Sequence, residues 1–513
     1  MAEHPTYDGL SAEDCRQIEN HGLSVADVES QLALLADPPP ATVLDRACTV
    51  GDGIVRLPEE SFATHQERFE TGAAEGRFAK FVPASGAASR MFKDLMAAEP
   101  DAVARLLADL DRFAFAEDLR RAVESAGGDV DGLRASGDGT AFLNGLLGDD
   151  GLGYGKAAKA LILFHHDGER GLTALEEQLI ETADHLRDRD GVCRLHLTIP
   201  QHQELLFREH LRVITARLEK ERGVTFELSL SIQGPETDTV AGDVDGGPFR
   251  DEDGRLFFRP GGHGALLKNL ERFAPDLVFV RNIDNIQPLH RRREVLRWNR
   301  ILGGYLLSLE EELVRILGRV ERVKAEDPAI DEEIRRMAEL LGRPDALEVL
   351  ERPARAKQAF LIDWLDRPLR IAGVVPNTGE PGGGPFWVRD TDGGVSPQIV
   401  ELSQVDREQS DQAEIVGGAT HFNPVHLVCR LRDHRGESYD LDRFVDPKAV
   451  FLSRKSHAGR PLVALERPGL WNGSMARWNT VFVEIPGAVF APVKTVFDLL
   501  RPEHQPEPPA NGA

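Results

Sequence analysis

The sequence is short of cysteine and contains no long apolar run, and each shortage excludes a class of protein. Its four cysteines are Cys15, Cys48, Cys193 and Cys429, and none of them stands in a paired metal-ligand spacing. This usage indicates a reducing compartment and predicts neither a disulfide framework nor a zinc site. No apolar stretch approaches membrane-spanning length, and the acidic, polar start MAEHPTYDGLSAEDC is unlike a signal peptide. We therefore expect a soluble, cytoplasmic protein with no membrane partner.

Basic residues are also scarce relative to acidic ones. Lys and Arg number 61 against 85 Asp and Glu, which gives a formal net charge of −24. A chain with this charge repels a polyphosphate backbone, so we expect no nucleic-acid partner. Any anionic ligand must instead be held by a local basic cluster. The 513 residues allow two or three domains, or one large domain with insertions.

The stretch Arg77 to Leu95 predicts a phosphate-binding turn. Its first part, residues 78–82, is typical of a short buried strand that ends at Pro83. The turn that follows consists of the small residues Ser85, Gly86, Ala87, Ala88 and Ser89, and Arg90 and Lys93 open a helix. Free backbone N–H groups, the helix dipole and the two cations would together attract an anion. An ordinary strand-to-helix turn would show the same short pattern, so this stretch alone leaves both interpretations open.

Strands alternate with helices along the middle of the chain, which favours an α/β domain with a mostly parallel sheet. Residues 193–199 and 224–232, which alternate or run apolar, and the apolar run at 277–280 predict strands, and residues 201–218 predict a helix between the first two. Ligands in such sheets bind at the carboxyl ends of the strands. Gln233 and Gly234 follow one predicted strand and Asp284 follows another. An aspartate in this position is also a common turn or cap residue.

Two further stretches carry candidate ligand-binding residues. Lys159 precedes an apolar run at 160–164 and is either a solvated loop residue or a phosphate contact beside the first turn. The loop containing Gly262, His263 and Gly264 opens onto a predicted helix. His263 is either an ordinary loop histidine or a ligand contact, and we favour the second because its glycines leave room for a ligand.

The remaining segments predict helices and a tail. Residues 1–76 are interpreted as a helical N-terminal segment, and residues 301–364 as a charged, amphipathic helical insertion. The two parts of the α/β core are then 77–300 and 365–503, and the Pro-rich residues 504–513 are expected to be disordered.

Eight short motifs occur in an order that resembles the UDP-glucose and UDP-N-acetylhexosamine pyrophosphorylase type of nucleotidyltransferase. They cover roughly residues 77–500 apart from the helical insertions. The motifs are Gly86-Ala-Ala-Ser-Arg-Met91, Lys159-Ala-Leu, Ser231-Ile-Gln-Gly-Pro235, Arg259-Pro-Gly-Gly-His-Gly264, Asn282-Ile-Asp-Asn285, Ile399-Val-Glu-Leu-Ser-Gln-Val405, His421-Phe-Asn-Pro424 and Val489-Phe-Ala-Pro-Val-Lys-Thr-Val-Phe-Asp-Leu-Leu500. Over its whole length the chain is identified as similar to a bacterial family catalogued only as a domain of unknown function (number 4301).

The resemblance implies a fold and a reaction. The fold is a Rossmann-like nucleotide-diphospho-sugar transferase fold of the GT-A-like kind, with a mixed, mostly parallel sheet flanked by helices. The reaction joins an NTP, with UTP favoured, to a sugar 1-phosphate and gives an NDP-sugar and pyrophosphate. The partners are therefore the NTP and the sugar 1-phosphate, and neither the base, the sugar nor the oligomeric state follows from the sequence.

The resemblance also implies a role for each candidate residue. The turn from Ser85 to Ser89, with Arg90 and Lys93, would bind the triphosphate. Lys159 would lie on the α-phosphate side, Lys494 would bind the sugar phosphate, and Asp284 would hold Mg²⁺ bridging phosphate oxygens. The base and ribose would meet Gln233, Gly234, Gly262, His263 and Gly264, and sugar hydroxyls would meet Glu401 and Asn423.

Several departures from the family pattern keep a second function open. Ser85, Ala87 and Ala88 stand where the resembled enzymes have glycine, and a Cβ there would narrow the nucleotide pocket. Ala158 replaces the proline before the lysine, and the chain ends soon after the Pro-Val-Lys-Thr element, without the β-helix that such enzymes often carry. The alternative is a catalytically inactive nucleotide or sugar-nucleotide sensor of the same fold. A glycosyltransferase of similar fold is a third possibility, against which the Pro-Val-Lys-Thr element argues.

Overall fold

A computed structural model describes residues 10–379, 382–389 and 394–506. The first nine residues, which contribute to the signal-peptide argument, and residues 507–513 of the predicted tail lie outside this part. The helices are α1 (Ala12–His21), α2 (Val25–Ala36), α3 (Phe62–Ala74), α4 (Lys93–Met96), α5 (Pro100–Ala108), α6 (Ala116–Ser125), α7 (Val130–Ser136), α8 (Thr140–Leu147), α9 (Ala174–His185), α10 (Glu204–Arg222), α11 (Leu267–Phe273), α12 (Arg292–Val320), α13 (Ala329–Leu340), α14 (Ala354–Leu365) and α15 (Ser410–Gly417).

The strands fall into one large sheet and several small ones. They are β1 (Leu44–Ala47), β2 (Thr49–Val50), β3 (Gly53–Val55), β4 (Phe78–Pro83), β5 (Leu163–His166), β6 (Gly171–Thr173), β7 (Val192–Ile199), β8 (Thr225–Ile232), β9 (Thr239–Val240), β10 (Gly242–Asp243), β11 (Phe258–Arg259), β12 (Leu277–Arg281), β13 (Leu369–Pro376), β14 (Gly383–Arg389), β15 (Val395–Glu401), β16 (His421–Arg430), β17 (Phe451–His457), β18 (Arg460–Glu466) and β19 (Asn479–Glu484).

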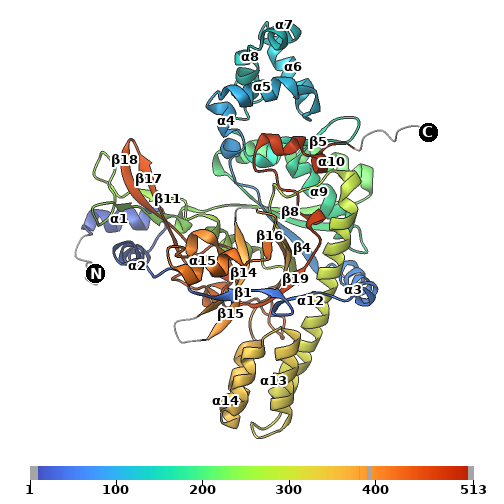
Figure 1. Cartoon of the computed structure of the whole chain (residues 1–513), viewed down its shortest axis with the longest axis vertical. Coiled ribbons are helices and arrows are strands. Elements are labelled where there is room, and N and C mark those ends of the chain that lie inside the picture. Colours follow the sequence, from blue (N-terminus) through green and yellow to red (C-terminus); the bar gives the residue numbers. More distant parts are fainter. Residues whose placement is uncertain (1–9, 380–381, 390–393, 507–513) are drawn as a thin grey trace.

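The large sheet has nine strands in the order β2-β3-β19-β13-β16-β12-β4-β7-β8. Every neighbouring pair is parallel except the two that involve β16, which runs antiparallel to both β13 and β12. The predicted mostly parallel sheet flanked by helices is therefore confirmed. The parallel arrangement brings the carboxyl ends of β4, β7, β8 and β12 to one edge of the sheet (Figure 1).

Helices cover one face of this sheet, and α11 with the β14–β15 hairpin covers the other. Successive residues of β12 show the division: Leu277 and Phe279 pack in a cluster with α3 and α12, whereas Val278 and Val280 pack in a cluster with α11 and Trp387 of β14. Because side chains alternate along a strand, a strand buried on both faces is apolar at every position. This explains the continuous apolar run at residues 277–280 of β12.

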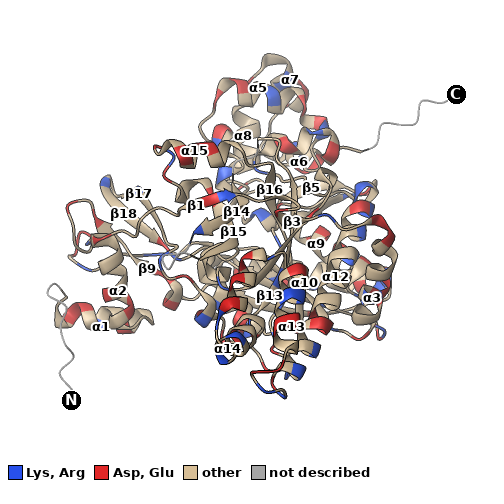
Figure 2. Ribbon diagram, turned by 60° about the horizontal axis from the view of Figure 1, so that its bottom comes forward, with Lys and Arg blue, Asp and Glu red and all other residues tan. Residues whose placement is uncertain are grey.

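Three outlying parts project from the core in Figure 1. Helices α4 to α8 form a lobe at the top of that view, α13 and α14 extend the lower end of α12 as a helical hairpin, and α1 and α2 lie near the β17–β18 hairpin. Acidic and basic residues are interspersed along α13 and α14 (Figure 2), as expected for an insertion with a solvated face. Among the described helices, none combines the length and the apolarity required to cross a bilayer.

Three predictions about the outlying segments were wrong in part. The N-terminal segment is not helical throughout, because residues 44–55 form three short strands and β3 pairs with β19 of the large sheet. The insertion has no boundary at residue 301, since α12 begins at Arg292 and packs on α3 before it projects. The tail is ordered at its start, because residues 502–504 form a 3-10 turn and His504 is buried. The rings of His504 and His165 share a hydrogen bond of 2.8 Å.

Candidate functional site

Three of the predicted site residues meet at the carboxyl edge of the large sheet. Asp284 follows β12, and its Oδ2 lies 3.0 Å from the Nζ atom of Lys159 and 3.1 Å from that of Lys494. Lys159 also donates to the carbonyl oxygen of Val493 at 3.1 Å. The three side chains come from distant parts of the chain, so only the tertiary structure brings them together.

The backbone around these residues is held by local hydrogen bonds. The N–H of Val493 donates to the carbonyl of Asp284, and residues 491–493 run beside 284–285 as an isolated antiparallel bridge. After Lys494, Thr495 and Asp498 form a capping box at the start of a 3-10 turn, and the Asp498 carboxylate accepts the N–H groups of Lys494 and Thr495 at 2.8 and 2.7 Å. The position of Lys494 is therefore fixed by its own turn and by the end of β12.

The charges at this cluster are unequally exposed. The side chain of Asp284 is 10% exposed and that of Lys159 12%, whereas that of Lys494 is 59% exposed. Burial by itself raises the pKa of Asp284, but the ammonium groups of Lys494 and Lys159 outweigh it and hold the pKa below its usual value. The carboxylate is consequently ionised at neutral pH, and two cations against one anion leave a net positive charge facing solvent.

The predicted phosphate-binding turn lies directly beside Lys159. The backbone N–H of Lys159 donates to the carbonyl of Gly86, and the N–H of Ala88 donates to the carbonyl of Ala157. Ala88 is fully buried and its N–H is therefore unavailable to a ligand. The N–H groups of Gly86, Ala87 and Ser89 have no acceptor among the described residues, and a Cβ added to Gly86 would meet nothing within 4 Å.

The helix expected after this turn is much shorter than predicted. Residues 88–90 form a 3-10 turn and α4 spans only four residues, so the helix dipole adds little to the site. Arg90 and Lys93 are both exposed, and neither makes an ion pair with a described residue. The carbonyl of the intervening Met91 accepts the N–H of Val496, which places this turn next to the segment that carries Lys494.

Gln233 and Gly234 lie at the same edge of the sheet, directly after β8. The Nε2 atom of Gln233 is buried and has no hydrogen-bond partner among the described residues. A buried amide N–H without an acceptor lowers the stability of the folded protein. We therefore expect a ligand or a water molecule to supply an acceptor there. The carbonyl of Gly234 is already used, since it accepts the N–H of Thr237.

Other parts of the chain fill the space beside the glycines around His263. The expectation that these glycines leave room for a ligand was therefore wrong. A Cβ on Gly264 would lie 2.1 Å from the carbonyl oxygen of Pro468, and one on Gly262 would lie 2.8 Å from the carboxylate of Glu466. His263 itself stacks on Trp471, with ring centroids 4.3 Å apart, and its Nδ1 accepts the N–H of Leu470 at 3.0 Å.

The two predicted sugar contacts lie in different surroundings. Glu401, at the end of β15, points one carboxylate oxygen toward Nε2 of His263 at 3.6 Å, and both side chains are about 30% exposed. Asn423 is buried at the start of β16, where its Oδ1 accepts the N–H of Val425, a residue with a φ of 56°. This part of β16 extends past the end of β12, so Asn423 lies at the same sheet edge as Asp284.

Two residues that the sequence analysis did not assign to the site support it. The side chain of Gln203 accepts the N–H of Ala158 and donates to the carbonyl of Lys156, and so holds the segment before Lys159. Asp498 holds Lys494 as described above. The Thr-x-x-Asp pattern could have revealed Asp498, whereas no local pattern indicates Gln203, because its contacts depend on the fold.

Asp284 offers little to a metal ion without the help of a substrate. Both ion pairs end on Oδ2, which leaves Oδ1 as the oxygen for coordination. Among the described residues, no group of three potential metal-ligating side chains includes Asp284. Because Mg²⁺ is commonly bound by one or two carboxylates together with substrate phosphates, this carboxylate fits a metal carried by a nucleotide rather than a preformed metal centre.

The fold and the site together define a mixed α/β protein. At the carboxyl edge of its sheet lie the basic cluster of Lys159 and Lys494 and the buried side-chain amide of Gln233, which has no hydrogen-bond partner among the described residues. The chain belongs to the family described as "Domain of unknown function (DUF4301)", whose profile matches residues 11–505. No curated protein matches the sequence.

The chain is similar to several solved structures. A UDP-glucose pyrophosphorylase from Leishmania major is 14% identical, with a TM-score of 0.45 and coverage of 96% of this chain and 79% of its own. A uridine diphosphate N-acetylglucosamine pyrophosphorylase from Trypanosoma brucei is 11% identical, with a TM-score of 0.45 and coverage of 91% and 71%. A putative UDP-N-acetylglucosamine pyrophosphorylase from Entamoeba histolytica is 11% identical, with a TM-score of 0.43 and coverage of 86% and 82%.

Proposed function

We propose that the protein is a nucleotidyltransferase that forms an NDP-sugar and pyrophosphate from an NTP, with UTP favoured, and a sugar 1-phosphate. The observation that carries the proposal is the convergence of Lys159 and Lys494 on Asp284, beside the turn at Gly86. In a chain with a net charge of −24, such a cluster is what an anionic ligand requires. The order of the sequence motifs supports the same reaction.

In the proposed reaction a phosphate oxygen of the sugar 1-phosphate attacks the α-phosphorus of the NTP in line. The new P–O bond forms as the bond to the β-phosphate breaks, and pyrophosphate leaves. Such a transfer requires little proton movement, and its rate depends on positioning and on neutralising the charge of the phosphates. Lys159 neutralises charge near the α-phosphate, and the more exposed Lys494 binds the incoming sugar phosphate.

Asp284 has two functions in this proposal. It holds both ammonium groups within hydrogen-bond distance of a single oxygen, and so places them close enough to bind neighbouring phosphates. Its Oδ1 is available to a Mg²⁺ ion that enters with the triphosphate. Bound Mg²⁺ would supply further neutralisation of the phosphate charge.

The remaining residues would bind the two substrates. The free N–H groups of Gly86, Ala87 and Ser89, with Arg90 and Lys93, would contact the triphosphate. The unpartnered Nε2 of Gln233 would donate to a carbonyl of the base. Asn423 and Glu401 would bind sugar hydroxyls. His263, whose Nδ1 is already used, would contribute only through Nε2. The cysteine usage supports a cytoplasmic location.

A sensor that binds a nucleotide or sugar nucleotide without turnover is the alternative. One observation favours it: both lysines already pair with Asp284. Such a protein would use the same residues for binding but would not bring the two phosphates into line.

The deciding experiment measures magnesium-dependent release of pyrophosphate with a panel of NTPs and sugar 1-phosphates. The proposed enzyme releases pyrophosphate only when both substrates and Mg²⁺ are present, and a sugar nucleotide accumulates in equal amount. Binding of a nucleotide by calorimetry without any release identifies the sensor. If neither binding nor release is found with any member of the panel, both interpretations are wrong.

A further inference from the structure

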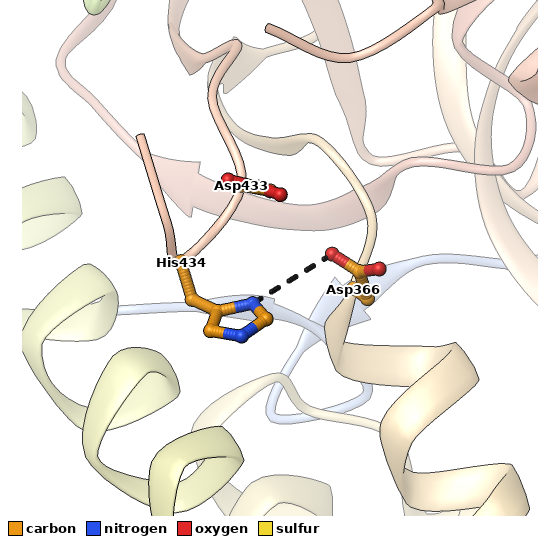
Figure 3. A group of neighbouring side chains, drawn as sticks. All are labelled: Asp366, Asp433 and His434. Atoms are coloured by element: carbon orange, nitrogen blue, oxygen red, sulfur yellow. Dashed lines mark ion pairs between the residues drawn. The ribbon is translucent and has the colours of Figure 1, made fainter. Parts of the chain in front are cut away.

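One group of titratable side chains outside the candidate site is a local polar network. It contains Asp366, which precedes β13, and Asp433 and His434, which follow β16 (Figure 3). The Nε atom of Arg435 donates to Nε2 of His434 at 3.3 Å, so the neutral ring carries its proton on Nδ1, 4.0 Å from Oδ1 of Asp366. The imidazole therefore connects a guanidinium to a carboxylate.

A second group is buried and joins the C-terminal segment, residues 495–505, to α9. Glu177 of α9, His165 of β5 and His504 are each at most 3% exposed. Both carboxylate oxygens of Glu177 lie 2.8 Å from Nδ1 of His165, and Nε2 of His165 lies 2.8 Å from Nδ1 of His504. We propose that His504 is a positioning residue, which holds the C-terminal segment on α9 and thereby fixes Lys494 in the candidate site.

A continuous series of contacts leads from His504 to Lys494. The backbone N–H of His504 donates to the carbonyl of Arg501 at 3.0 Å, and the guanidinium of Arg501 lies 2.8 Å from Oδ1 of Asp498. The Oδ2 atom of Asp498 accepts the backbone N–H of Lys494 at 2.8 Å. Anchoring His504 therefore restrains the capping box that holds the backbone of Lys494.

The same helix also holds the other partner of the ion pair. Gln178 follows Glu177 in α9, and its Nε2 donates to the carbonyl of Asn282 at 3.1 Å, two residues before Asp284. Successive residues of α9 thus restrain the end of β12 directly and the C-terminal segment through two histidines. Displacement of the C-terminal segment would therefore leave Asp284 in place and allow Lys494 to move away from it.

The other polar anchor beyond residue 501 is more exposed than His504. Gln505 donates to the carbonyls of Arg112 and Leu499 at 3.2 and 2.6 Å, and Arg112 is exposed. A hydrogen bond shielded from water is stronger than an exposed one. The ring of His504 has no other hydrogen-bond partner among the described residues, so the bond to His165 holds it. Burial lowers the pKa of His504 to about 3, and the ring is therefore neutral at pH 7.

The expected effect on catalysis rests on the proposed function, in which Lys494 binds the sugar phosphate. A loosened C-terminal segment should weaken binding of the sugar 1-phosphate and spare the NTP, whose proposed contacts lie on the turn at Gly86. A loss of stability alone would lower the amount of active protein and leave both KM values unchanged. The two substrates therefore distinguish positioning from a purely structural role.

The test compares His504→Ala with His504→Asn in the full-length protein. Asparagine places an amide group close to the position of Nδ1 and can still form a hydrogen bond with His165. In His504→Ala, amide exchange at residues 494–496 should rise at least about tenfold, while exchange in β12 stays as in the wild type. The KM for the sugar 1-phosphate should rise on the order of tenfold, and the KM for the NTP by less than about twofold. His504→Asn should keep these quantities near their wild-type values.

Glu503→Ala is the matched control, because Glu503 lies in the same turn and its side chain makes no hydrogen bond or ion pair with a described residue. This variant should behave as the wild type. The proposal is overturned if His504→Ala leaves exchange at residues 494–496 unchanged, or if exchange rises without a change in the KM for the sugar 1-phosphate. It is equally overturned if His504→Asn behaves like His504→Ala. A wild-type protein that releases no pyrophosphate would instead refute the proposed function, and amide exchange alone would then decide whether His504 holds the segment.

Discussion

At the scale of single residues, Asp284 organises the candidate site because it fixes two cations that the sequence places far from it. Lys159 is almost as buried as Asp284, and its Nζ has two oxygen partners, the carboxylate and the carbonyl of Val493. The Nζ atom of Lys494 has one oxygen partner, the carboxylate of Asp284, and the side chain is mostly exposed. Exposed ion pairs contribute little to stability. Lys494 can therefore be removed with little effect on the fold, whereas the loss of Lys159 would leave buried polar groups unpaired.

Replacing Lys494 by alanine tests the proposed function without unfolding the protein. We expect the rate of sugar-nucleotide formation to fall by about 10²–10³, the effect typical of removing one group that stabilises transition-state charge. The Tm should stay within about 1 °C of the wild type, because the side chain is exposed. Steady-state pyrophosphate release measures the first effect and thermal unfolding the second.

The matched control is Lys324→Ala, which removes an exposed lysine between α12 and α13 that takes no part in the proposed site. This variant should retain the wild-type rate. An unimpaired rate in Lys494→Ala would contradict the role assigned to Lys494.

Replacing Gly86 by valine tests whether the turn lies against a ligand. A Cβ at this position meets no protein atom within 4 Å, so the fold should tolerate the change. The valine side chain should instead collide with a bound triphosphate, and we therefore expect kcat/KM for the NTP to fall at least about tenfold. Gly417→Val is the control, since a Cβ at Gly417 also meets nothing within 4 Å and lies on α15. Equal activity in the two variants would show that Gly86 faces only solvent.

At the scale of elements, the crossing of α3 and α12 illustrates how close packing fixes the core. These two helices make one of the most extensive contacts between elements of the fold. A Cβ on Gly304 of α12 would lie 1.7 Å from the backbone carbonyl oxygen of His65 in α3, and one on Gly303 would lie 2.5 Å from the ring of Phe69. The small residues therefore allow the helix backbones to approach each other.

Gly304→Ala should separate the two helices. Although alanine is favoured over glycine in a helix by about 1 kcal/mol, the clash with backbone should exceed this gain and destabilise the protein by about 2 kcal/mol or more. Gly318→Ala on the same helix should instead stabilise it by about 0.5–1 kcal/mol, since its Cβ would meet only the end of the flexible Arg322 side chain at 3.6 Å. Urea denaturation of both variants gives the comparison, and equal midpoints would contradict the packing argument.

At the scale of the whole molecule, long-range ion pairs hold the outlying parts on the core. In the N-terminal part, Asp14 of α1 closes a capping box with Ser11 and pairs with Arg250 at 2.8 Å, while Ile18 and Val28 pack against Val240 and Leu256. The hydrogen bond from Arg250 is the main reason that the pKa of Asp14 falls to about 2. Ionised Asp14 is therefore favoured by the folded state.

This shift predicts a dependence of stability on pH. Because the folded pKa lies below the unfolded value of 3.8, the contribution of Asp14 is complete above about pH 4 and is lost as the pH falls toward about 2. Asp14→Asn should cost roughly 1–2 kcal/mol at neutral pH, and the difference from the wild type should vanish across that interval. Amide exchange of α1 and α2, measured for both proteins at each pH, reports the difference.

Asp27→Asn provides the control for this prediction, because Asp27 is exposed on the first turn of α2 and makes no ion pair with a described residue. Its effect on stability at neutral pH should be small. A constant difference between Asp14→Asn and the wild type from neutral pH to about pH 2 would contradict the linkage.

Much of the core could be predicted from local pattern, and the exceptions share a cause. The runs at 78–82, 193–199 and 277–280 form β4, β7 and β12 with nearly the same bounds, because strands buried on both faces are mostly apolar, even though β4 contains Lys80 and β7 contains Arg194 and His196. The strands at 44–55 were missed because they are very short and contain charged residues such as Asp45 and Arg46, which pair with each other at the surface. Nothing in the sequence of β16 indicates that it runs against its neighbours, since direction depends on the connections rather than on composition.

The sequence by itself determined the class of fold, the negative charge of the chain and the positions of Lys159, Asp284 and Lys494 just after or before predicted elements. Each of these depends on neighbours within a few residues or on composition alone. Only the tertiary structure decided that the two lysines share one carboxylate oxygen and that the glycines beside His263 accommodate residues 466–468 rather than a ligand. It alone also brought Asp366 beside His434. These outcomes depend on contacts between segments far apart in the chain, and a one-dimensional pattern carries no record of such contacts.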